Sequence, residues 1–84
     1  MMKFIVTADV EVHLLNGDVS THEVRNVFYP NKTFEEVFGW LDAEACRVME
    51  FVAMRLGGVE LDENGKVNGC YFLKKNIVIK PVEE

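Results

Sequence analysis

The sequence predicts an α+β protein in which an antiparallel sheet packs on one long helix. A helical period of apolar residues runs through residues 33–57, whereas residues 3–15 alternate between apolar and polar types, as in a half-buried strand. Two turn signals, Asn16-Gly17-Asp18 and Asp62-Glu63-Asn64-Gly65-Lys66, separate further strand-like segments. The expected order is ββαβββ, and residues 1–84 are too few for more than a single domain.

The predicted helix has one apolar face, whose residues recur three and four positions apart. This face consists of Phe34, Val37, Phe38, Leu41, Ala45, Val48, Met49, Val52 and Leu56. Thr33 and Glu36 have the spacing of a capping box, and Gly57-Gly58 is a predicted C-cap. Gly39 and Asp42 are weak helix formers, so a break near Asp42 is an alternative. The apolar face keeps its phase across them, which favours one continuous helix.

The first strand, residues 3–15, can pair with a returning strand at residues 19–29 in two registers. A two-residue turn at Asn16-Gly17 would bury two charges, because it places on the apolar face Val19, Thr21, Glu23 and Arg25. A three-residue loop shifts the pairing by one position and places on that face Ser20, His22, Val24, Asn26 and Phe28. We favour the three-residue loop because it buries Val24 and Phe28. A bulge near Asn26 is a further expectation.

The C-terminal third reads as short strands at residues 59–61, 67–73 and 77–82. Lys74-Lys75-Asn76 is expected to turn the chain between the last two strands. Pro81 cannot donate a backbone hydrogen bond, so it suits an edge strand or a strand end.

Charge, hydropathy and cysteine content limit the possible functions. The formal net charge is −5, and residues 1–42 hold three basic against seven acidic residues. Because Lys and Arg drive binding to phosphate backbones, an acidic chain is a poor candidate for non-specific nucleic-acid binding. No apolar run reaches the roughly 18 residues of a membrane span. We expect a soluble, cytoplasmic protein that does not contact the membrane, with Cys46 and Cys70 as reduced thiols in or near the core.

Catalytic and metal-binding motifs are weak in this sequence. In the favoured register Glu11 and Glu23 are expected opposite each other, with His13 on the same face and His22 on the other. This set lacks a second nitrogen ligand, so we favour an ordinary solvated sheet face and predict no metal site and no cofactor. The sequence also lacks a nucleophile elbow, a phosphate loop and a paired-cysteine motif. We therefore assign no catalytic residues and do not expect an enzyme.

A second helix face is the predicted interface, and it carries Trp40, Ala43, Arg47, Phe51 and Met54. Trp, Phe, Met and Arg are enriched at the cores of protein interfaces. One sheet covers roughly one face of a helix, so these side chains either meet a partner or are wrapped by the long hairpin. We favour a partner, which is expected to be a second copy of the chain.

Three functional hypotheses follow. The favoured one is a small interaction or accessory protein that acts by protein–protein contact, as a homodimer. An alternative is an acidic inhibitor that mimics nucleic acid and blocks a nucleic-acid-binding enzyme, using Asp9, Glu11, Asp18 and Glu23. Another is a small nucleic-acid binder whose Lys-rich C-terminal hairpin carries Lys66, Lys74, Lys75, Lys80, Tyr71 and Phe72. Lysines also blunt exposed sheet edges, so the last alternative is disfavoured.

Overall fold

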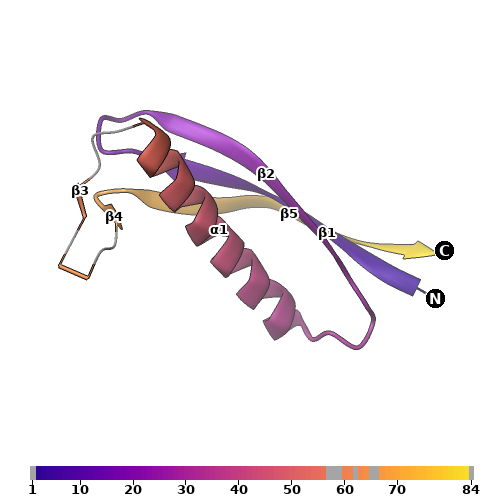
Figure 1. The fold of residues 1–84 in the computed structure, drawn as a ribbon. Coiled ribbons are helices and arrows are strands. Elements are labelled where there is room, and N and C mark those ends of the chain that lie inside the picture. The colour runs from indigo at the N-terminus through magenta and orange to yellow at the C-terminus, as the bar shows by residue number, and fades with distance from the viewer. Residues whose placement is uncertain (1, 57–59, 62, 65–66, 84) are drawn as a thin grey trace.

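A computed structural model describes residues 2–56, 60–61, 63–64 and 67–83 of the chain. Its elements are β1 (Met2–His13), β2 (Val19–Phe28), α1 (Phe34–Leu56), β3 (Glu60–Leu61), β4 (Val67–Asn68) and β5 (Tyr71–Glu83). Three long strands form one antiparallel sheet in the order β2-β1-β5, and α1 crosses one side of it (Figure 1). The predicted α+β class, with an antiparallel sheet and one helix, is confirmed.

The predicted arrangement of the C-terminal strands is wrong. Separate strands were expected at residues 67–73 and 77–82, but Tyr71–Glu83 is one continuous strand that pairs with β1 along its length. The short strands β3 and β4 pair with each other in a second, two-stranded sheet. The long sheet therefore has three strands, with β2 and β5 at its two edges.

A β-bulge explains why the expected turn at Lys74-Lys75-Asn76 does not form. Asn76 and Ile77 both lie opposite the single residue Ala8, where the β1–β5 register shifts. Asn76 has a φ of 53°, a left-handed conformation that Asn tolerates better than most residues. Its side-chain amide donates to Asp9 Oδ2 at 2.8 Å. The extra residue is thus absorbed within the strand, and the chain does not reverse.

The first hairpin has the predicted three-residue loop. The Leu14 N–H donates to the Asp18 carbonyl at 2.9 Å, and the Gly17 N–H donates to the Leu14 carbonyl at 3.0 Å. Gly17 has a φ of 91°, as expected for the left-handed residue that follows the turn in such loops. The register places Val24 opposite Ala8, and Val24 is buried. The bulge expected near Asn26 is not found, because the β1–β2 pairing is continuous.

The predicted capping box forms at the start of α1. Thr33 Oγ1 accepts a hydrogen bond from the Glu36 N–H at 3.2 Å, and Glu36 Oε2 accepts one from the Thr33 N–H at 3.0 Å. The helix continues through Asp42 to Leu56 without a break, as predicted. The C-cap predicted at Gly57-Gly58 lies outside the described residues.

Replacing Thr33 by Ala is expected to lower the free energy of unfolding by about 1 kcal/mol, because the Glu36 N–H loses its acceptor. The Thr33→Ser variant keeps the hydroxyl and is expected to unfold at nearly the wild-type midpoint. Urea denaturation followed by circular dichroism measures both changes. Equal losses from the two substitutions would contradict a capping role for the hydroxyl.

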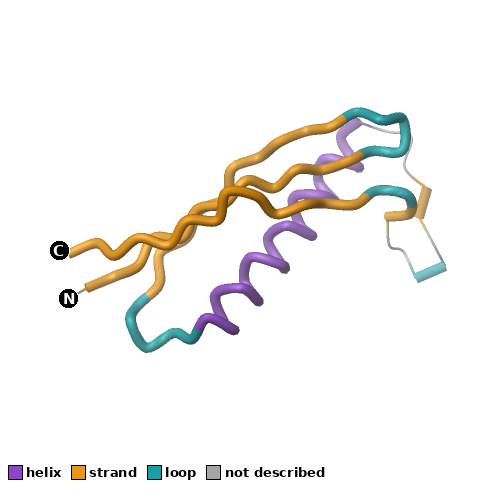
Figure 2. Tube along the Cα trace, turned by 180° about the vertical axis from the view of Figure 1, so that it is seen from behind, coloured by secondary structure: helices purple, strands orange, loops and turns teal. Residues whose placement is uncertain are grey.

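The hydrophobic core lies between α1 and the sheet, in a two-layer arrangement seen from behind in Figure 2. Alternate residues of β1 meet one stripe of the helix there, as the two periodicities require. The central cluster consists of Ala8, Val10, Val12, Val24, Leu41, Ala45 and Val52. Val6, Val37 and Ala53 are also buried.

The apolar helix face is buried only in part, which corrects the predicted core. Phe34 is 70% exposed and Phe38 is 40% exposed, although both belong to the predicted face. A cavity of about 410 Å³ lies between the first turn of α1 and the sheet, so this end of the helix is covered only in part, with Val37 buried and Phe34 exposed. Cys46 is exposed rather than near the core, whereas Cys70 is half-buried, and both are free thiols.

Candidate protein–protein interface

The predicted interface residues on α1 differ widely in exposure. Met54 is 80% exposed and Phe51 is 62% exposed, so two large apolar side chains lie in water near the C-terminal end of the helix. Ala43 and Arg47 are also exposed. Trp40 is half-buried and packs against the core.

Trp40 is partly covered within the chain. Its ring meets that of Phe28 edge-to-face, with centroids 5.5 Å apart and an interplanar angle of 70°. Phe28 is the last residue of β2, so the long hairpin reaches this part of the helix face, as the alternative to a partner foresaw. The open part of the surface is therefore formed by Ala43, Arg47, Phe51 and Met54, which we call the helix flank.

Arg47 forms an ion pair within its own helix. Its guanidinium donates two hydrogen bonds to the Glu44 carboxylate, one of them from Nε to Oε2 at 3.3 Å. The hydrogen bond with Glu44 raises the pKa of Arg47, so this side chain is charged at every relevant pH. The pair lies one turn apart on the helix surface, a spacing typical of stabilising side-chain contacts.

A shallow groove joins the helix flank to strand β2. It has a volume of about 290 Å³ and is lined by His22 of β2 and by Arg47, Val48 and Phe51 of α1. His22 Nε2 lies 2.6 Å from Ser20 Oγ, so the imidazole is held by its own strand. The helix flank and the β2 side of the sheet are thus parts of one surface, a relation that the sequence did not reveal.

Of the side chains considered for a metal site, Glu11, His13 and Glu23 lie on the sheet face away from the helix, whereas His22 lies on the helix side. The predicted pairing of Glu11 with Glu23 is wrong, because Glu11 lies opposite Thr21, and Glu23 lies opposite Asp9. The three-residue loop pairs Leu14 with Asp18 and His13 with Val19, and this register places Glu11 opposite Thr21. In the part of the chain that the structure describes, no three His, Cys, Asp or Glu side chains could together hold a metal ion.

Glu11 instead belongs to a small polar cluster. Its carboxylate accepts a hydrogen bond from Lys75 Nζ at 3.0 Å and lies 2.6 Å from His13 Nε2. The hydrogen bond from Lys75 has the larger effect and the contact with His13 the smaller, and both lower the pKa of Glu11 below its ordinary value. Their stabilising effect is full above the pKa of Glu11 in the unfolded chain and is lost as pH falls through the lower folded value. The His13 ring also stacks on Tyr71, with centroids 4.5 Å apart.

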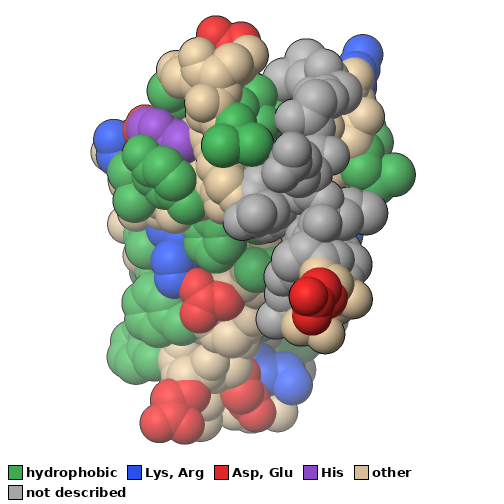
Figure 3. All heavy atoms as spheres, turned by 90° about the vertical axis from the view of Figure 1, so that its left-hand side faces the viewer, with side chains coloured by type: hydrophobic (Ala, Val, Ile, Leu, Met, Phe, Trp, Pro, Cys, Tyr) green, Lys and Arg blue, Asp and Glu red, His purple; other side chains and the backbone are tan. Residues whose placement is uncertain are grey.

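The charged side chains that the alternative functions require are mostly paired within the chain. Lys74 forms an ion pair with Asp42, and Lys75 contacts Glu11. Asp18 Oδ2 accepts a hydrogen bond from the Asn16 amide at 2.9 Å. At the end of the molecule drawn in Figure 3, acidic and basic side chains alternate with hydrophobic ones, and no large area has a single sign. Lys66 lies outside the described residues.

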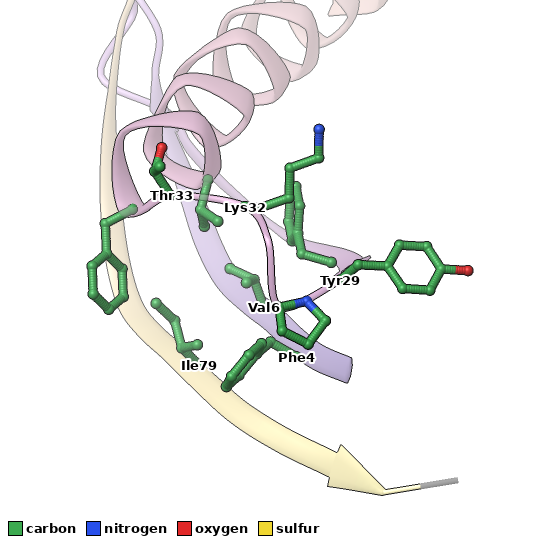
Figure 4. A pocket seen from close by; sticks show the side chains of 10 residues that line it. Phe4, Val6, Tyr29, Lys32, Thr33 and Ile79 are labelled. Atoms are coloured by element: carbon green, nitrogen blue, oxygen red, sulfur yellow. The ribbon is translucent and has the colours of Figure 1, made fainter. Parts of the chain in front are cut away.

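A second hollow, larger than the groove beside the flank, lies at the opposite end of the helix. This cavity of about 410 Å³ opens between the start of α1 and the sheet (Figure 4). Its walls are mainly apolar and come from Phe4, Val6, Phe28, Tyr29, Pro30, Lys32, Thr33, Phe34, Val37 and Ile79. The Lys32 side chain points away from the hollow, and Thr33 Oγ1 is used by the helix cap. The cavity could accommodate an apolar group. Its lining residues include no pair of side chains that could act as acid and base.

Comparison of the chain with models of known protein families, with curated protein sequences and with solved structures finds no match. Within the described residues, no helix is both long enough and apolar enough to cross a membrane. Fold and surface define a small α+β protein with an exposed apolar helix flank beside a sheet edge.

Proposed function

We propose that this protein is a small intracellular interaction protein that acts by protein–protein contact and self-associates through the helix flank. The observation that carries the proposal is the exposure of Phe51 and Met54, which lie one turn apart on α1. Burying such a side chain contributes about 1.5–3 kcal/mol, which is large for a domain of this size. The proposed role is binding rather than catalysis. An intracellular location is supported by Cys46 and Cys70, which are both free.

The shape of the chain supports association as well. Its radius of gyration is 14.9 Å and its extents are 46 × 24 × 16 Å. A compact domain of this length has a radius of gyration of about 12 Å. A thin, elongated chain buries little of its apolar surface, so a second copy against the flank would add to a small core.

Arg47 and Glu44 fit the centre of a two-fold contact. In an isologous interface residue i of one copy meets residue j of the other and j meets i, so an Arg47–Glu44 pair at the axis would face the same pair of the other copy, with Arg47 opposite Glu44. Opposite charges within each pair allow the two pairs to interlock without placing like charges together. The apolar side chains of Phe51 and Met54 would then be covered on either side of the axis.

Light scattering tests this proposal. The wild type is expected to have twice the 9.6 kDa mass of one chain at high micromolar concentration. A Phe51→Glu, Met54→Glu variant is expected to be a monomer, because carboxylates would have to be buried without partners. The matched control is Phe34→Glu, which changes another well-exposed Phe on the same helix, outside the flank, and should leave the dimer intact. A wild type with the mass of a single chain at this concentration would contradict the proposal.

A further inference from the structure

The two edges of the sheet are protected to very different degrees. Exposed edge strands pair with other chains unless charged side chains, proline or bulges prevent it. The β5 edge has all three devices: Lys74, Lys75 and Lys80, Pro81, and the bulge at Asn76. Strand β2, with the sequence VSTHEVRNVF, has no Lys, no Pro and no bulge in its pairing with β1, and its two charged side chains, Glu23 and Arg25, are of opposite sign. The less protected edge, β2, is the one beside the helix flank.

The backbone groups that β2 presents at this edge follow from the hairpin. The Leu14–Asp18 pair is hydrogen-bonded, so in the alternating antiparallel pattern every second residue from Ser20 to Phe28 bonds to β1. The intervening residues direct their N–H and C=O groups outward, and they are Val19, Thr21, Glu23, Arg25 and Val27. The Val27 N–H agrees with this assignment, because it donates to the side-chain oxygen of Asn26 at 2.8 Å.

We propose that two copies of this chain pair antiparallel through their β2 edges and so form a continuous six-stranded sheet. This inference rests on the proposed function and names the geometry of the self-association. A two-fold axis perpendicular to the sheet keeps both helices on the same side, where the two helix flanks face each other across the new β2–β2 junction. An axis within the sheet plane would place the helices on opposite sides and leave Phe51 and Met54 of both copies exposed.

The charges on β2 select the register of this pairing. With the axis at Val24, Glu23 of each copy lies opposite Arg25 of the other, and oppositely charged cross-strand pairs are stabilising. With the axis at Glu23 instead, the two Glu23 carboxylates would lie directly opposite each other, and like charges in that position are destabilising. Glu23 and Arg25 are both exposed on the outer sheet face, so they are free to meet a second chain there. The axis at Val24 is therefore the self-complementary choice.

Charge reversal tests the register. In Glu23→Arg and in Arg25→Glu, like charges meet at two symmetric positions, and each substitution is expected to raise the dimer dissociation constant about tenfold. The double variant restores opposite charges at both positions and is expected to return to the wild-type constant. Sedimentation equilibrium measures all four proteins. A double variant as weak as the single ones would overturn the axis at Val24.

Amide hydrogen exchange tests the β2 pairing itself, separately from the dimer mass. In the wild-type dimer the outward N–H groups of Thr21, Glu23 and Arg25 are expected to exchange slowly, and in the Phe51→Glu, Met54→Glu monomer they should exchange fast. Phe72 and Ile79 are the controls, because their N–H groups point outward at the β5 edge and should exchange fast in both proteins. A dimer with fast exchange at Glu23 and Arg25 overturns this inference but leaves the proposed function standing. A wild type that is a monomer overturns both.

Discussion

A Val52→Asp variant is expected to be unfolded at ambient temperature. Val52 is 5% exposed and belongs to the central cluster between α1 and the sheet, so the carboxylate would have no water and no cation to meet. Leaving a buried charge without a partner costs roughly 3–5 kcal/mol. A chain of this length has a total stability of about 4–13 kcal/mol, and the elongated shape favours the lower end. The loss is therefore comparable to the whole stability of the chain.

The matched control is the same substitution one turn earlier. Val48 is half-buried and lines the groove between α1 and β2, so an aspartate there can turn its carboxylate toward water. We expect Val48→Asp to remain folded, with a loss of about 1 kcal/mol. Thermal denaturation followed by circular dichroism distinguishes the two variants. Equal melting temperatures for Val52→Asp and wild type would mean that the central cluster is not the core.

The second large effect is expected at Gly69, which precedes β5. Gly69 has a φ of 80°, and a Cβ atom there would lie 2.4 Å from Cδ2 and 2.5 Å from Cγ of Leu15. The left-handed conformation costs a non-glycine residue roughly 1–2 kcal/mol, and forcing the half-exposed Leu15 side chain off its rotamer costs about 0.5–1.5 kcal/mol more. We expect Gly69→Ala to lower the free energy of unfolding by the sum of the two, in urea denaturation.

A Gly17→Ala variant separates the cost of the left-handed conformation from the cost of the contact with Leu15. Gly17 has a φ of 91°, but no atom lies within 4 Å of the position that a Cβ would take. Gly17→Ala is therefore expected to show the conformational cost alone and to be the milder variant. Adding Leu15→Ala to Gly69→Ala removes the obstructing atoms and should recover part of the loss. Equal destabilisation of Gly17→Ala and Gly69→Ala would mean that the contact with Leu15 adds no cost at Gly69.

The candidate interface was visible in the sequence only in part. The pattern on α1 identified Phe51 and Met54, which the structure finds well exposed, because helical periodicity fixes which side chains share a face. It did not show that Trp40 meets Phe28, since that contact depends on how far the hairpin extends along the helix. The absence of Lys and Pro from β2 was also readable in the sequence. The absence of Lys and Pro bears on self-association only because β2 is an edge strand, which the sheet order shows.

Local chemistry accounts for the features that could be read directly from the chain. The capping box of Thr33 and Glu36, the three-residue loop ending at Gly17 and the uninterrupted helix each involve residues close together in sequence. Their geometry follows from side-chain-to-backbone hydrogen bonds, backbone preferences and the period of apolar residues, none of which needs a distant partner.

Long-range packing accounts for the rest. Asn76 has the local preference of a turn residue, yet it lies in a bulge within the continuous strand β5. Pairing of β5 with β1 before and after the bulge outweighs that local preference. Phe34 and Phe38 have the period of core residues but are exposed, whereas Val37 between them is buried, and a cavity lies between the start of the helix and the sheet. Which strands become the edges of the sheet is likewise a property of the assembled sheet. It arises from contacts between segments far apart in the chain, which no local pattern encodes.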